Sequence, residues 1–118
     1  MNTRLAAQRS GAEGEARVAQ ALEASGWSVL SRNWHGGGGE LDLVAIREGS
    51  LRFVEVKARG HDDPVGIEAV GPDKQRKLTR AAQAWMMAES PDFNDVSFMV
   101  VLVEPDGMTW YDDAFDVE

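Results

Sequence analysis

An almost continuous apolar run, "DVSFMVVLVE" from residue 95 to residue 104, restricts the fold more than any other feature of this sequence. Successive side chains of a strand point to opposite faces, so a strand that is apolar throughout has to be covered on both sides. We therefore predict an interior strand of a sheet with helices packed against it. The segment "MTWYDD", which follows a turn at Pro105–Gly107, is predicted to be its hairpin partner.

Two helices and three further strands are predicted from local patterns. Helical spacing of apolar residues predicts one helix from Ala12 to Ser25, with Gly26 as its stop, and a second from Pro72 to Glu89 with proline at its first position. Between them, "WSVLSRNW", "ELDLVAI" and "LRFVEVK" are predicted to be strands, the last two joined by "REGS". The order is therefore α-β-β-β-α-β-β, an α/β fold with a central sheet of about five strands flanked by helices.

Two segments rich in turn-forming residues are interpreted as loops. The run from Gly36 to Gly39 is interpreted as a loop that forms a flexible approach to Asp42, because it lacks the Lys-Ser/Thr ending of a phosphate-binding loop. The segment from Ala58 to Gly71 is predicted to be a mobile surface loop.

Length and composition fit one compact domain. The 118 residues are 43% hydrophobic, enough for a core, so we expect a single domain over residues 1–118 with a flexible N-terminus of about residues 1–10. The absence of cysteine excludes disulfides, thiolate metal sites and cysteine nucleophiles. No segment has the length of a signal peptide core or a membrane span, so we expect a cytoplasmic protein without a membrane partner.

The net charge of −8 is unevenly distributed. Residues 1–88 hold all 12 Lys and Arg against 11 Asp and Glu, whereas residues 89–118 form an acidic C-terminal segment with 9 acids and no base. The basic residues that lie close together in the sequence are Arg52, Lys57, Arg59, Lys74, Arg76, Lys77 and Arg80. They are candidates for a surface that meets nucleic-acid phosphates, and solvated surface charge is the alternative.

The connection "REGS" fixes a register for the central hairpin. In that register, the numbers of opposed residues sum to 97, which pairs Ile46 with Leu51 and Val44 with Phe53. Continued to the open end, the same register places Asp42 opposite Glu55 and Glu40 opposite Lys57. Because side chains alternate with period two, all eight are expected on one side of the ribbon, apolar near the turn and charged at the open end.

Opposed carboxylates at Asp42 and Glu55 predict a metal site. Like charges that face each other across strands are destabilising without compensation, and hard carboxylate ligands suit Mg²⁺ or Mn²⁺. Lys57 points the same way and is a candidate to stabilise a pentavalent phosphate or to orient an attacking water. The alternative is a salt-bridged hairpin end without metal.

Glu15 is the third candidate ligand. It shares a helix face with Val18, Ala19 and Leu22, at the spacing that packs inward. The alternative is an acid near a helix N-terminus that the helix dipole favours.

The fragments "GAEGEARVAQALEASGW", "RNW", "GELDLVA", "FVEVKAR" and "DKQRKLTRAA" together resemble the YraN-like family of small bacterial proteins. That family is similar to Holliday-junction resolvases of the restriction-endonuclease-like superfamily, whose active site follows the pattern acid, Asp, Glu-x-Lys. The resemblance implies a restriction-endonuclease-like fold with a mixed sheet, the catalytic set Glu15, Asp42, Glu55 and Lys57, and Gln75 as a helper. It also allows a homodimer, since resolvases that act on two-fold junctions generally act as dimers.

The sequence departs from this pattern at three positions. Leu41 precedes the aspartate where the superfamily often has proline, which is typical of the YraN-like branch. His35 and Met99 replace a basic residue and an aspartate of the family, and both changes concern substrate contacts more than the metal site.

Two functions from different classes follow. The first is a Mg²⁺- or Mn²⁺-dependent endonuclease that acts on branched or structured DNA, with Glu15, Asp42 and Glu55 at the metal and Lys57 assisting hydrolysis. In this function Arg59, Lys74, Arg76 and Lys77 would contact DNA, and Lys74 and Gln75 lie in the first turn of the second helix, whose positive end suits a phosphate. The second is a nucleic-acid-binding module that keeps the fold without cleaving. An ion-pair network with no nucleic-acid role is the third interpretation.

Overall fold

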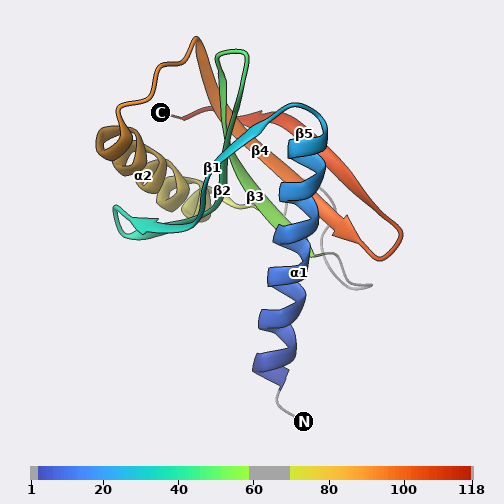
Figure 1. The fold of residues 1–118 in the computed structure, drawn as a ribbon. Coiled ribbons are helices and arrows are strands. Elements are labelled where there is room, and N and C mark those ends of the chain that lie inside the picture. Colours follow the sequence, from blue (N-terminus) through green and yellow to red (C-terminus); the bar gives the residue numbers. More distant parts are fainter. Residues whose placement is uncertain (1–2, 59–69, 118) are drawn as a thin grey trace.

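The computed structural model describes residues 3–58 and 70–117, with side chains described from residue 12 onward. The predicted order α-β-β-β-α-β-β is confirmed (Figure 1). The elements are α1 (Thr3–Ala24), β1 (Ser28–Gly36), β2 (Gly39–Arg47), β3 (Ser50–Ala58), α2 (Pro72–Glu89), β4 (Asp95–Glu104) and β5 (Gly107–Phe115). The first helix starts earlier than the predicted Ala12, and α2 has the predicted bounds. The predicted loop between Ala58 and Gly71 falls largely on residues 59–69, which lie outside the described residues.

The five strands form one mixed sheet in the order β1-β2-β3-β4-β5. Only the β3–β4 pair is parallel, and the other neighbouring pairs are antiparallel. The apolar run of β4 lies between β3 and β5 and is buried from Ser97 to Val103, as predicted for an interior strand. The predicted hairpin of β4 with β5 is also confirmed.

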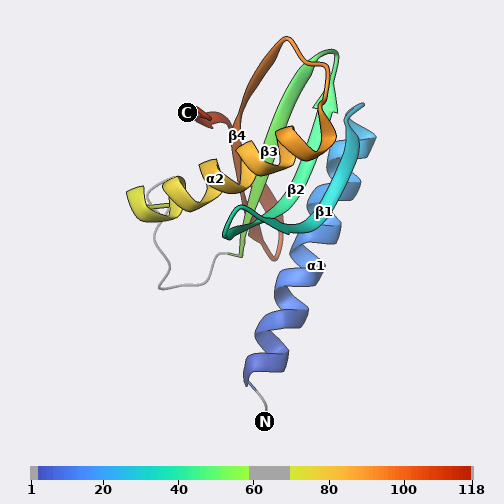
Figure 2. The ribbon, with the colours of Figure 1, turned by 90° about the vertical axis from the view of Figure 1, so that its left-hand side faces the viewer.

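The two helices cover opposite faces of the sheet (Figures 1 and 2). The helix α1 packs on one face through three fully buried residues, Val18, Ala19 and Leu22. The helix α2 packs on the other through Leu78, Ala81, Ala82 and Trp85. This three-layer arrangement buries both faces of β4, which is why its sequence is apolar at consecutive positions. Neither helix in the described part of the chain is long and apolar enough to cross a membrane.

The glycine run forms a tight hairpin, so its interpretation as a loop is confirmed for Gly37 and Gly38 and wrong for Gly36 and Gly39. Gly36 and Gly39 pair as strand residues, and Gly37 and Gly38 form the turn with φ of 61° and 83°. A Cβ on Gly37 would lie 2.6 Å from the carbonyl oxygen of Arg80, and one on Gly39 would lie 2.8 Å from that of Lys77. The run is glycine because this hairpin packs directly on the backbone of α2.

The register of the β2–β3 hairpin is confirmed near the turn and fails at the open end. The pairs Ile46–Leu51 and Val44–Phe53 form as predicted, but the ladder ends at Leu43–Val54. The predicted pairs of Asp42 with Glu55 and of Glu40 with Lys57 do not form. Leu41 packs in the same core cluster as Val44, although strict alternation would place the two on opposite faces. The alternation of β2 therefore breaks just where the charged residues begin.

Candidate functional site

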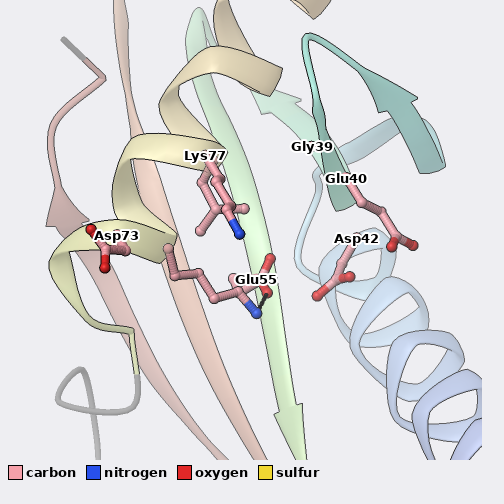
Figure 3. Close-up of a pocket in the computed structure, with 8 residues that line it drawn as sticks. Gly39, Glu40, Asp42, Glu55, Asp73 and Lys77 are labelled. Atoms are coloured by element: carbon pink, nitrogen blue, oxygen red, sulfur yellow. Dashed lines mark ion pairs between the residues drawn. The ribbon is translucent and has the colours of Figure 1, made fainter.

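An open cavity of about 500 Å³ lies between the charged ends of β2 and β3 and the first turns of α2 (Figure 3). Its lining residues are Gly39, Glu40, Asp42, Glu55, Asp73, Lys74, Lys77 and Leu78. The strands supply Asp42 and Glu55 from one side, and α2 supplies Asp73 and Lys77 from the other (Figure 3). The cavity thus combines carboxylates on a rigid sheet with cations on a helix.

The end of the β2–β3 ladder fixes the side chain of Asp42. If the register continued, Val56 would pair with Leu41, but no such pair forms. Instead, the backbone N–H of Val56 donates a 2.8 Å hydrogen bond to Oδ2 of Asp42. The carboxylate thus takes the place of a strand carbonyl, because a partly buried N–H requires an acceptor.

Glu55 is the most buried acid of the site. Its side chain is only 7% exposed, and its Oε1 lies 3.0 Å from Nζ of Lys74 and 3.8 Å from Nζ of Lys57. Burial and the negative charge of Asp42 raise the pKa of Glu55 to about 7, although both lysines act in the opposite direction. The raised pKa therefore reflects burial first and the charge of Asp42 second.

The chain contains three lysines: Lys74 and Lys77 line the cavity, and Lys57 does not line it but contacts Glu55. Burial, together with its contact to Lys74, lowers the pKa of Lys57. Burial acts to lower the pKa of Lys74 as well, but contacts with Lys57 and the charge of Glu55 outweigh it, so the pKa is raised. Lys77 lines the cavity one helical turn further along α2. A lysine ammonium is a compact point charge, suited to a phosphate or a carboxylate.

Glu15 lies on the α1 side of Asp42 and does not line the cavity. It is half-buried next to the core residues of α1, as its position on the helix predicted. Burial and the negative charges of Asp42 and Glu40 raise its pKa, while a hydrogen bond from Asn33 lowers it. Glu15 is therefore electrostatically coupled to Asp42 from the opposite side.

Within the described ranges, no three His, Cys, Asp or Glu residues are arranged closely enough to hold a metal ion. The predicted ligand set of Glu15, Asp42 and Glu55 therefore stays a prediction, with Asp42 and Glu55 as the two members that share the cavity. This pair suits Mg²⁺ or Mn²⁺, because the two carboxylates supply oxygen ligands. Either ion would retain several waters as its remaining ligands.

Two other predicted site residues, Gln75 and Arg76, do not line the cavity. Gln75 donates from Nε2 to the carbonyl oxygen of Val70 at 2.9 Å, and with Arg76 it lines a separate hollow on another side of α2. Arg76 also forms an ion pair with Asp73. Arg59 lies outside the described residues.

Three contacts that shape the site are not predicted from the sequence. Lys74 was predicted to contact nucleic acid, but not to be the direct partner of Glu55. Asn33 and Glu40, the neighbours of Glu15, were not predicted to act on it. All three contacts depend on how the helices dock on the sheet, and only the positive φ of Asn33 is a local feature of the backbone.

Comparisons with known proteins place the chain in a family. The model of the "Uncharacterised protein family UPF0102" matches residues 14–103, which include every site residue discussed above. A UPF0102 protein of Synechococcus sp. (strain JA-3-3Ab) is 47% identical over 108 residues, covering 88% of this chain and 82% of that protein. Another from Rhodopseudomonas palustris (strain BisB18) is 45% identical over 104 residues, covering 86% and 76%. The UPF0102 protein BRADO0179 of Bradyrhizobium sp. (strain ORS 278) is 42% identical, covering 86% and 72%. The chain therefore belongs to the uncharacterised protein family UPF0102.

Proposed function

We propose that this protein is a Mg²⁺- or Mn²⁺-dependent endonuclease that acts on structured or branched DNA. The observation that carries the proposal is the shared cavity, where Asp42 and Glu55 lie with Lys74 and Lys77, while Lys57 contacts Glu55. A phosphodiester brings negative charge to a site, and lysines around a carboxylate pair suit both the phosphate and a divalent cation. The resemblance of "GELDLVA" and "FVEVKAR" to the resolvase pattern supports the same assignment.

Each residue has a separate role in this proposal. Asp42 and Glu55 would hold the metal, which when bound supplies a Lewis acid and a water of lowered pKa. Lys57 stabilises charge on the phosphate that is attacked, and Lys74 and Lys77 contact the phosphates of the strand. Glu15 acts indirectly, through its electrostatic interaction with Asp42 from the α1 side. A homodimer and a cytoplasmic location stay predictions.

The alternative is a nucleic-acid-binding module that does not cleave. One observation favours it: Glu55 already forms ion pairs with Lys74 and Lys57. Because these lysines neutralise the carboxylate, Glu55 can position them to bind phosphate without a metal ion.

A cleavage assay with matched variants separates the two functions. Purified protein is incubated with Mn²⁺ or Mg²⁺ and labelled four-way, flap, single-stranded and duplex DNA. We expect metal-dependent cleavage of at least one branched DNA, loss of cleavage in Asp42→Asn, and retention in Asp73→Asn, which removes a carboxylate from the α2 side of the same cavity. Binding without cleavage of any substrate would favour the alternative, and neither binding nor cleavage would contradict both.

A further inference from the structure

The contact between Lys74 and Glu55 joins two different parts of the chain. Lys74 lies in the first turn of α2 and has a 44% exposed side chain, whereas Glu55 is buried on β3. Their 3.0 Å separation is that of a direct, charge-assisted hydrogen bond. Lys57, the other partner of Glu55, is further away at 3.8 Å.

We infer that Lys74 is an internal cation that occupies Glu55 in the metal-free protein and is displaced when a divalent cation binds. This inference rests on the proposed function, because it requires that Glu55 is a metal ligand. An ammonium and a metal ion both bind to the lone pairs of a carboxylate, and Oε1 of Glu55 is the atom that Lys74 already contacts.

The position of Lys74 makes this exchange feasible. Its exposed side chain extends from a helix turn at the mouth of the cavity, so its ammonium can leave Glu55 without any movement of the sheet. Glu55 itself is buried on β3, where its backbone pairs with Val100 of β4. Once released, the ammonium of Lys74 is available to a phosphate at the same cavity, so that metal binding prepares the contact with DNA.

Metal titration of two matched variants tests the inference. Lys74→Met and Lys77→Met each remove one ammonium from the lining of the cavity, but of these two lysines it is Lys74 that forms the ion pair with Glu55. Mg²⁺ is titrated by calorimetry into chelator-treated protein, in alkaline buffer well above the pKa of Glu55. We expect Lys74→Met to bind Mg²⁺ about two- to fivefold more tightly than Lys77→Met, the range that corresponds to a partly exposed ion pair.

A second measurement follows the lysines directly. Because the chain has three lysines, isotope-labelled lysine gives three side-chain NMR signals that single variants assign. We expect Mg²⁺ to move the Lys74 signal of the parent protein to the position of a solvent-exposed lysine. Equal Mg²⁺ affinity in the two variants, or an unchanged Lys74 signal at saturating Mg²⁺, would overturn the inference and leave the proposed metal site intact. The absence of Mg²⁺ and Mn²⁺ binding in every variant would overturn both.

Discussion

The carboxylate of Asp42 accepts the backbone N–H of Val56 at 2.8 Å, where the β2–β3 ladder has ended. Asp42 therefore has a structural task as well as a proposed role at the metal. Asn can still accept this N–H through its amide oxygen, whereas Ala leaves it without an acceptor.

We predict that Asp42→Asn changes the free energy of unfolding by less than about 1 kcal/mol, while Asp42→Ala lowers it by about 1–3 kcal/mol. Urea denaturation in chelator-treated buffer measures both. In Mg²⁺ titrations, Asp42→Asn should bind the metal more weakly than the parent protein. Equal stability of the Asn and Ala variants would show that the hydrogen bond contributes nothing.

The buried carboxyl of Glu55 predicts a pH dependence of stability. Its pKa is raised from 4.5 to about 7, so the folded protein binds this proton more tightly than the unfolded chain does. The free energy of unfolding should therefore fall as the pH rises from about 4.5 to about 7, by at most about 3 kcal/mol from this group. Glu55→Gln should remove this decline. Denaturation curves of both proteins across this pH range, without metal, measure the difference, and parallel pH profiles would contradict the prediction.

Gly37 and Gly38 offer a matched pair for the contact of the hairpin with α2. Both have positive φ, so alanine is strained at either position. Only at Gly37 would a Cβ meet the backbone of α2, whereas at Gly38 nothing lies within 4 Å. We expect Gly37→Ala to be less stable than Gly38→Ala by about 1–3 kcal/mol, measured by thermal unfolding. Equal losses would mean that α2 moves aside without cost.

Arg52 links three strands on the sheet. Its side chain is 9% exposed and forms ion pairs with Asp112 of β5 at 2.7 Å and with Asp95 of β4 at 3.1 Å. We predict that Arg52→Ala lowers the free energy of unfolding by about 2 kcal/mol, because it removes a packed stem and both ion pairs. Asp112→Asn should cost less than about 1 kcal/mol, because Asp112 is half-exposed and Asp95 remains. A larger loss in Asp112→Asn than in Arg52→Ala would reverse this assignment.

The cavity lysines predict the salt dependence of DNA binding. Lys77→Met should weaken DNA binding about equally for all DNA sequences. It should also reduce the magnitude of the slope of log affinity against log salt concentration by about one. Arg47→Met is the control, because Arg47 stacks over Trp27 beside the end of α1, at 4.5 Å from its ring centroid. Fluorescence anisotropy with labelled DNA measures both. If the two variants lose the same affinity, DNA does not dock at the cavity.

The sequence by itself determined the order of elements and much of their length. The bounds of α2 and β4 follow from local signals, namely proline at the first position of the helix and an apolar run that only an interior strand tolerates. The register of β2 with β3 near the turn follows from the short connection and the two-residue period of strands. The bounds and the register can be predicted from the sequence because they depend on residues that are close together in the chain.

The tertiary structure decided how the charged residues meet. The break in β2 turns the carboxylate of Asp42 to the N–H of Val56, and the docking of α2 brings Lys74 to Glu55. The glycine hairpin, which the sequence indicated as a flexible loop, is fixed because its backbone packs on α2. No local pattern encodes these contacts, since each depends on the packing of elements far apart in the chain, where burial and close approach of backbones outweigh the preferences of single segments.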